Sequence, residues 1–268
     1  MKRVAEAMGV SRPHLTSPAA DRPRRRYAKG DDEALLRRIR AIVDARPSYG
    51  YRRVTARLNR EQPEVRVNHK RVYRVMKQAG LLLARYGRKP NLLHDGKVIT
   101  MASDLRWCSD MFKLRCWNGE KVHVGFSLDC CDREAIAWVA SDGHLDGRDV
   151  RDLMAQSIEA RFGATRTPRP IEWLSDNGPP FTATETRDFG RQCGLQIRNT
   201  PAYSPESNGM AEAFVKTFKR DYAYLADLPN ARAALAQLDG WFEDYNEHHP
   251  HKGLKMLLRR EFRRSRSA

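Results

Sequence analysis

The chain has 268 residues, of which 41% are hydrophobic and 31% charged, and its formal net charge is +16. This length allows a substantial core and excludes a small peptide module, and no apolar run is long enough for a membrane-spanning helix. The five cysteines form no CxxC pair and lie at no finger-like spacing with histidines, so we expect reduced thiols in a cytoplasmic protein without structural zinc.

The charge is unevenly distributed along the chain. Residues 1–100 contain 25 basic and 9 acidic side chains, residues 101–251 contain 17 and 23, and residues 252–268 contain 7 and 1. Basic ends contact phosphates, whereas an acidic centre repels DNA unless metal ions neutralise it. This arrangement is typical of a metal-dependent DNA enzyme, although a soluble protein with basic disordered ends would carry the same charges.

The first 29 residues are expected to form a basic N-terminal arm. After a short helix-like start they become rich in proline and arginine, and the apolar content after Leu15 is too low to bury a core. Residues 84–100 are expected to form a second basic segment, a linker that tracks DNA or joins two domains.

Between these segments, residues 30–83 predict a small unit of three short helices. Apolar stripes recur at helical spacing in Leu35–Val43, Val54–Leu58 and Val72–Met76, and the segments Pro47–Gly50 and Gln62–Pro63 separate them. Such a basic helical unit fits helix-turn-helix binding to DNA.

The third predicted helix is the candidate recognition helix. Asn68 is its expected N-cap, and the helix should end near Gly80. Basic side chains of this helix and of the second one are expected to contact DNA: Arg52, Arg53, Lys70, Arg71, Arg74 and Lys77. A helical hairpin with a solvated basic face remains an alternative.

Residues 101–250 predict an α/β domain. Three consecutive antiparallel strands should come first, followed by alternating helices and strands. The expected strands are Leu105–Leu114, Lys121–Leu128, Ala135–Ser141, Ile171–Ser175 and Leu195–Thr200. The expected helices are Arg148–Phe162, Thr184–Cys193, one that opens near Asn208, and Arg232–Glu247. Residues 251–268 would follow as a basic C-terminal tail.

Three acidic residues of this domain are candidate metal ligands. Asp110 interrupts an aromatic and apolar strand, Asp176 ends a short apolar strand, and Glu212 begins a helix 36 positions later. Three carboxylates gathered from two strands and a helix suit a hard divalent cation such as Mg²⁺, which leaves positions for water and substrate phosphate. The candidate chemistry is therefore phosphoryl transfer on nucleic acid.

Other acids compete for these roles. Asp104 precedes the first strand, Asp129 lies at the end of the second, Asp132 sits in a turn, and Glu206 lies in the loop before the helix of Glu212. Each chosen acid also has a purely structural interpretation, as a half-exposed strand charge, a turn residue or part of a solvated helix face.

Lys216 and Lys219 follow Glu212 at helical intervals of four and seven residues. They therefore share a surface with this carboxylate, and we expect them to contact the phosphates of DNA. Three histidines, at positions 248, 249 and 251, surround Pro250 and are expected to end the last helix rather than to hold zinc.

Six segments carry a recognisable pattern: Ser48–Val54, Trp107–Asp110, Leu128–Glu134, Ser175–Gly178, Ser204–Tyr222 and Tyr245–His251. With these segments the chain resembles the insertion-sequence transposases related to retroviral integrases, specifically the second-reading-frame product of two-frame elements. Two segments depart from the pattern, Pro179–Pro180 and Leu257–Arg260, and neither contains a candidate acid.

The resemblance implies a ribonuclease-H-like catalytic core with a DDE triad at Asp110, Asp176 and Glu212. Lys219 matches the basic residue of the family. Two Mg²⁺ ions, or Mn²⁺ as a substitute, would support nicking and then strand transfer at the ends of the element, without a covalent enzyme intermediate.

The resemblance also implies the partners. These are DNA of the element's terminal repeats and of the target, other copies of the chain when two ends are synapsed, and the product of the upstream reading frame as a frameshifted fusion, at the nucleoid in a bacterial cytoplasm. Two alternatives remain open: a non-enzymatic DNA-binding regulator or assembly partner, and a metal-dependent nuclease that hydrolyses without joining strands.

Overall fold

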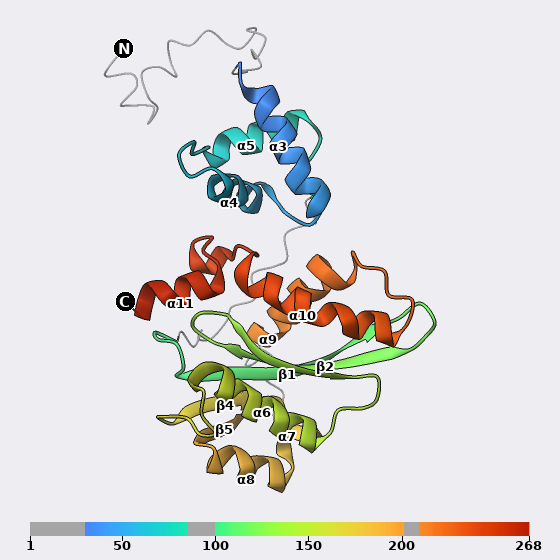
Figure 1. Cartoon of the computed structure of the whole chain (residues 1–268), viewed down its shortest axis with the longest axis vertical. Coiled ribbons are helices and arrows are strands. Elements are labelled where there is room, and N and C mark those ends of the chain that lie inside the picture. Colours follow the sequence, from blue (N-terminus) through green and yellow to red (C-terminus); the bar gives the residue numbers. More distant parts are fainter. Residues whose placement is uncertain (1–29, 85–99, 201–208, 268) are drawn as a thin grey trace, which may run out of the picture.

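The computed structural model describes residues 30–84, 100–200 and 209–267. The predicted arm and nearly all of the predicted linker lie outside these ranges. A small helical unit is followed by a larger domain, in which helices cover both faces of a sheet (Figure 1). None of the helices in the described ranges combines the length and apolar character needed to cross a membrane.

The helical unit consists of three short helices, as predicted: α3 (Asp32–Ala45), α4 (Tyr51–Glu61) and α5 (His69–Gln78). Their apolar stripes meet in one core, in which Ile39, Val54 and Val72 are fully buried. The side chain of Asn68 caps α5 by accepting a 2.8 Å hydrogen bond from the amide two residues later, as predicted. Gly80 follows the helix in the left-handed conformation, with φ of 70°.

The sheet contains five strands: β1 (Arg106–Arg115), β2 (Lys121–Asp129), β3 (Ala135–Ser141), β4 (Ile171–Ser175) and β5 (Leu195–Asn199). Their spatial order is β3-β2-β1-β4-β5. The first three strands pair antiparallel, and β4 and β5 continue the sheet in parallel beyond β1. This mixed sheet confirms the predicted α/β class, a ribonuclease-H-like core preceded by a helical unit.

Helices form a layer on each face of the sheet (Figure 1). One layer contains α6 (Gly147–Phe162), α7 (Pro179–Thr182) and α8 (Thr184–Gln192). The other contains α9 (Gly209–Phe218), its π-helical continuation η2 (Lys219–Ala223), α10 (Ala231–Glu247), the 3-10 turn η3 (Lys252–Leu254) and α11 (Arg259–Ser267).

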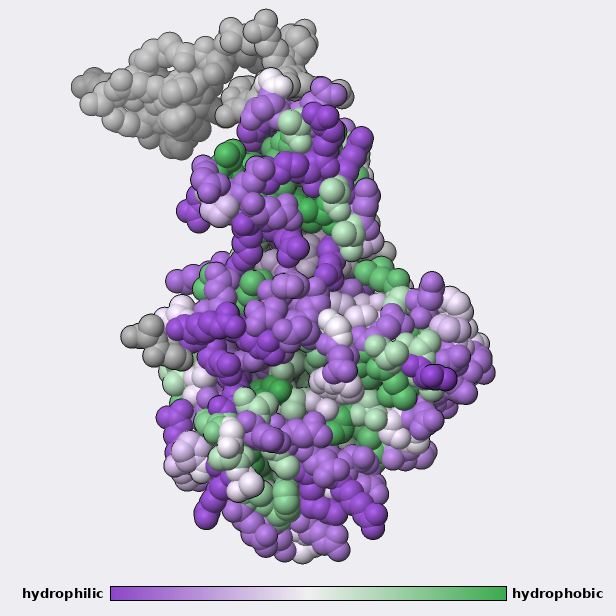
Figure 2. Space-filling model, in the orientation of Figure 1, coloured by the Kyte–Doolittle hydropathy of each residue, from purple (hydrophilic) through white to green (hydrophobic). Residues whose placement is uncertain are grey.

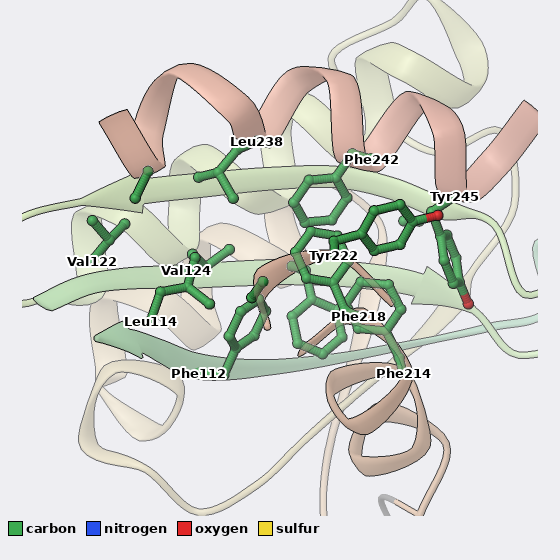
Figure 3. Packing of buried hydrophobic residues seen from close by; sticks show 14 of the residues in the cluster. Phe112, Leu114, Val122, Val124, Phe214, Phe218, Tyr222, Leu238, Phe242 and Tyr245 are labelled. Carbon is green, nitrogen blue, oxygen red and sulfur yellow. The ribbon is translucent and has the colours of Figure 1, made fainter. Parts of the chain in front are cut away.

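Aromatic side chains fill the space between the sheet and the layer of α9 and α10 (Figure 3). Phe112 of β1 faces Phe218 of α9 with 5.6 Å between ring centroids, and Phe242 of α10 lies 4.7 Å from the same ring. Burial of these rings is a large apolar contribution to stability. Because α9 is fixed between strand and helix in this way, the residues at its two ends have defined places relative to β1.

The C-terminal residues depart from the expectation of a basic tail. They form η3 and α11, and Arg259 at the start of α11 is fully buried. Arg260 and Arg263 then pair with Glu134 at the start of β3, at 2.8 and 3.1 Å. The positive charges of this segment therefore bind the core as well as facing solvent. Pro179 and Pro180, which depart from the family pattern, open the short helix α7.

A buried arginine organises the end of the sheet next to α11. Arg161 of α6 is only 1% exposed, and four carboxylates surround it: Asp104 at 3.5 Å, Asp129 at 3.9 Å, Asp132 at 3.1 Å and Glu134 at 3.3 Å. Three of these acids competed with Asp110 in the sequence. Their place around Arg161 gives them a structural function, because they neutralise a buried cation.

Replacing Arg161 with methionine should therefore strongly destabilise the protein. The variant keeps most of the side-chain volume but leaves buried carboxylates without their cation, so we expect the free energy of unfolding to fall by about 3–5 kcal/mol in urea denaturation. Arg191→Met is the matched control, since Arg191 is 62% exposed and forms an exposed ion pair with Asp188, and it should cost at most about 1 kcal/mol. Equal losses in the two variants would contradict this interpretation.

Candidate active site

Asp110 and Asp176 are placed by the parallel pairing of β1 with β4. The last paired residues are Cys108 and Leu174, so each aspartate lies two residues beyond this pair on its own chain. Side chains two residues apart along a strand share a face of the sheet. Leu174 packs against the same core cluster as Phe112, on the side of α9. Both aspartates are therefore directed to the face that α9 covers.

Glu212 approaches the same face from above the sheet. It lies in the first turn of α9, where Ala211 and Phe214 are buried against the strands and Glu212 itself is exposed. The helical period turns its side chain away from the buried stripe, toward the edge of the helix. Asp110, in the middle of β1, and Asp176, directly after β4, are each half-buried.

The charges of the two other candidate acids reach Asp110. Burial raises the pKa of Asp110 to about 6, and the negative charges of Asp176 and Glu212 add to this rise, whereas a hydrogen bond from the amide of Met111 opposes it. Asp176 and Glu212 therefore lie near enough to Asp110 to affect its pKa. A half-buried carboxylate beside two like charges favours a cation at the same place.

Asp176 is held by its neighbours in the turn after β4. Its Oδ1 accepts a 3.0 Å hydrogen bond from the amide of Gly178, and its carbonyl oxygen accepts one of 2.9 Å from Asn199 Nδ2. A Cβ at Gly178 would lie 3.0 Å from the same Oδ1, so only glycine leaves this carboxylate undisturbed. Asn177 closes the turn by donating to the carbonyl of Thr200 at 2.9 Å.

The donor set fits a hard divalent cation, since it consists of three carboxylates and Mg²⁺ prefers oxygen ligands. Within the described residues, no three acidic, histidine or cysteine side chains stand close enough to hold a metal ion as they are. Of the three carboxylates, that of Glu212 is exposed, whereas those of Asp110 and Asp176 are half-buried.

The two lysines after Glu212 lie in different environments. Lys216 is exposed on α9, whereas Lys219 begins the π-helical segment and places its Nζ 5.5 Å from the ring centroid of Phe112. Burial lowers the pKa of Lys219, and the nearby charge of Arg115 lowers it further. Lys219 therefore lies on the face of β1 that carries Asp110, as its spacing from Glu212 predicts.

The basic residues expected to contact DNA fall into two groups. Lys70 and Lys77 of α5 are exposed, and so is Arg52 of α4. Arg71 and Arg74 instead pair with Asp32 at the start of α3, at 2.9 and 2.7 Å.

Arg53 has a partner in the larger domain. Its Nη1 lies 3.1 Å from Oδ2 of Asp221, and its side chain is 20% exposed. Asp221, His249 and Arg259 surround this contact. Asp221 and His249 lie in segments that resemble the family, but nothing in the sequence pattern predicts that they meet Arg53. The competing Glu206 lies outside the described residues.

Comparisons with known families and proteins agree with this arrangement. Residues 30–90 match the HTH-like domain, and residues 102–205 and 193–257 match two models of the integrase core domain. The transposase InsD of the Escherichia coli insertion elements IS2A/D/F/H/I/K is 46% identical over 249 residues, covering 91% of this chain and 82% of that protein. The chain belongs to the insertion-element transposase family. The InsD protein of IS2D from Escherichia coli K12 matches equally well.

One solved structure has a similar fold at low sequence identity, and a second aligns more weakly. A chain of the simian T-cell lymphotropic virus intasome aligns over 84% of this transposase-family chain and 74% of its own length, with a TM-score of 0.54 and 14% identity. The HTLV-2 integrase catalytic core domain, solved in complex with magnesium, aligns over 61% of this chain and 98% of its own length, with a TM-score of 0.47 and 15% identity.

The effect of the neighbouring negative charges on the pKa of Asp110 can be tested by titration. The variant Asp176→Asn removes one of the negative charges that raise the pKa of Asp110, so this pKa should fall from about 6 toward the ordinary aspartate value. Carboxyl carbon NMR without divalent metal measures it directly. Asp188→Asn, an exposed acid on α8, is the control and should leave the titration unchanged. An unchanged pKa of Asp110 in Asp176→Asn would show that the charge of Asp176 does not affect Asp110.

Proposed function

We propose that this chain is a DNA transposase that nicks the ends of an insertion element and joins them to target DNA, with Asp110, Asp176 and Glu212 as its catalytic triad. The observation that supports this most directly is the raised pKa of Asp110, caused by burial and by the two other acids. Burial is the larger cause and the charges of Asp176 and Glu212 add to it, and a carboxylate with its pKa raised in this way is typical of a functional site. Membership of the insertion-element transposase family gives the reaction class.

The three carboxylates would hold Mg²⁺, two ions being the expectation from the family, with Mn²⁺ as a substitute. Bound there, the ions would activate the attacking hydroxyl or water and stabilise the leaving oxygen of a DNA phosphodiester. Asp110 must be deprotonated to act as a ligand, and Gly178 keeps the carboxylate of Asp176 in place. Lys219 would place its ammonium group beside the phosphate, on the face of β1 that carries Asp110.

The helical unit would supply affinity for DNA. Lys70 and Lys77 of α5, with Arg52 of α4, are exposed and available for phosphates, and Lys216, four residues after Glu212 on α9, is exposed as well. On the face shown in Figure 2, hydrophilic side chains cover most of the helical unit. Element ends and target would be the substrates, two copies of the chain would synapse two ends, and the upstream reading-frame product would be a partner.

The test is a nicking and joining assay on labelled element-end DNA with Mg²⁺ or Mn²⁺. The chain should be tested alone and fused to its upstream reading frame. Asp110→Asn, Asp176→Asn and Glu212→Gln should each lower the cleavage rate by at least about a thousandfold and leave DNA binding largely intact, because they remove ligands of the ions that stabilise the transition state. Asp188→Asn on exposed α8 is the matched control.

Each outcome of this assay has a definite meaning. Joined products that are lost in the triad variants support the transposase. Nicked products without joining would indicate a metal-dependent nuclease. Specific binding without any cleavage, even in the fusion, would indicate a DNA-binding regulator. Full cleavage by one triad variant would remove that residue from the triad.

The reaction should also depend on pH through Asp110. Because the pKa of this group is raised to about 6, protonation removes a ligand below that pH, and the nicking rate should fall about tenfold per pH unit there. A cation competes with the proton, so a higher Mg²⁺ concentration should move the profile to lower pH. Single-turnover rates between pH 5 and 8 measure this effect. A rate that is independent of pH in this range would contradict a ligand role for Asp110.

A further inference from the structure

Two of the segments that resemble the family, Ser48–Val54 and Tyr245–His251, contain none of the proposed catalytic acids. The structure nevertheless packs them against each other. The ring of Tyr49, at the start of the helical unit's second helix, meets the ring of His249 edge-on, with 5.5 Å between centroids. Tyr49 is 2% exposed and His249 is fully buried. Their meeting point lies next to Asp221.

Asp221 is a buried carboxylate in the π-helical segment η2, and three side chains donate to it. Its Oδ2 lies 3.1 Å from Arg53 Nη1, 2.8 Å from His249 Nε2 and 2.6 Å from Arg220 Nη2. Burial alone would raise the pKa of Asp221, but the hydrogen bonds from His249 and Arg220 outweigh it and hold the pKa well below the usual range. Asp221 is therefore charged at neutral pH.

His249 connects Asp221 to Arg259, the first residue of the C-terminal helix α11. Burial lowers the pKa of His249 to about 4, and the charge of Arg259 adds to this effect against the opposing hydrogen bond with Asp221. The neutral ring donates from Nε2 to Asp221, and its Nδ1 accepts a 3.1 Å hydrogen bond from Arg259. We assign this tautomer from the two partners. Arg259 also lies 3.6 Å above the ring of Tyr245.

Two more arginines of the helical unit bind acids of the larger domain. Arg46, which follows α3, lies 2.5 Å from Asp244 of α10. Arg60 of α4 lies 2.6 Å from Glu261 of α11 and also donates to the carbonyl of Met256 at 3.0 Å. In these contacts, as in that of Arg53, the cation comes from the helical unit and the acid from the larger domain. The two surfaces are electrostatically complementary.

The contact surface between the helical unit and the larger domain, which we call the docked surface, is not a continuous apolar interface. A cleft of about 310 Å³ remains beside these ion pairs; residues of the helical unit, including Arg46 and Tyr49, line most of it, and His248 is its lining residue from the larger domain. The ion pairs around this cleft are made by the long side chains of Arg46, Arg53 and Arg60. Such an interface orders two parts relative to each other through a few specific pairs, and removal of one pair weakens it selectively.

We propose that Asp221 is a positioning residue that makes catalysis depend on the docked helical unit. This inference rests on the proposed function, because the helix it positions carries Glu212. Asp221 lies nine residues after Glu212 and two after Lys219 in one continuous helical segment. Glu212 is exposed in the α-helical part of this segment and Asp221 is buried in its π-helical part, so the catalytic residue and the docked residue lie at its two ends. Contact of the helical unit with Asp221 thereby fixes the rotation of the segment formed by α9 and η2 and its height above β1.

The test compares Arg53→Gln with Arg57→Gln in the full chain, using the Mg²⁺-dependent nicking assay at saturating DNA. Arg57 is the matched control, because it loses the same charge from the same helix and its recorded ion pair is with Glu61 on that helix. Arg53→Gln should lower the nicking rate about ten- to a hundredfold and change the DNA dissociation constant less than about threefold, since a misplaced catalytic helix affects the chemical step. Arg57→Gln should change neither quantity by more than about twofold.

Further variants separate positioning from general loss of structure. Arg53→Lys should recover most of the rate, because lysine keeps the charge opposite Asp221. The double variant Arg53→Gln with Asp221→Asn should be no slower than the slower single variant, as expected for two partners of one contact. A weaker DNA affinity with an unchanged saturated rate would overturn the inference and make Arg53 a DNA contact.

Hydrogen exchange provides a readout that does not require cleavage. The amides of residues 212–223 should exchange at least about fivefold faster in Arg53→Gln than in the unaltered chain, and should not change in Arg57→Gln. Equal exchange in the two variants would overturn the inference even if all the proteins cleave DNA. If the unaltered chain does not cleave but exchange responds as expected, the proposed function fails and the coupling between the helical unit and the helix of Glu212 remains.

Discussion

The arrangement of this molecule depends on two aspartates next to one helical segment, Asp221 and Asp110, which lie in opposite electrostatic environments. Asp221 receives hydrogen bonds from Arg53, Arg220 and His249, and its pKa is lowered. Asp110 has two acidic neighbours, and its pKa is raised. The first carboxylate is satisfied within the chain, so it joins parts of the fold. The second remains unbalanced, which is the condition of a site that binds something from outside.

The segment formed by α9 and η2 connects these two environments. Its aromatic side chains, Phe214, Phe218 and Tyr222, fix it against β1 and α10 (Figure 3). A π-helical turn often marks a functional position in a helix, because the extra residue changes the direction of the side chains that follow. In this chain the turn begins at Lys219, directly after the part that faces the sheet, and it contains Asp221. The helix therefore serves the proposed triad at one end and the helical unit at the other.

Much of this fold could be predicted from the sequence, because its strands and amphipathic helices follow simple periods of apolar residues. Asn68 identified the start of α5, and the apolar run before Asp176 identified β4. The C-terminal helix α11 was missed, since its stability depends on a buried Arg259 and on ion pairs with distant acids, which no local pattern reveals. The ion pair of Arg53 with Asp221 joins residues 168 positions apart, so the sequence predicted only a basic side chain available for DNA.

The internal ion pairs of the helical unit also determine how salt affects its binding to DNA. The logarithm of a DNA-binding constant falls with the logarithm of salt concentration in proportion to the number of counterions released from phosphates. Arg46, Arg53 and Arg60 face carboxylates of the larger domain, and Arg71 and Arg74 face Asp32. These five guanidinium groups already have carboxylate partners before DNA arrives. The salt dependence of binding should therefore reflect fewer contacts than the number of basic residues in the N-terminal hundred implies.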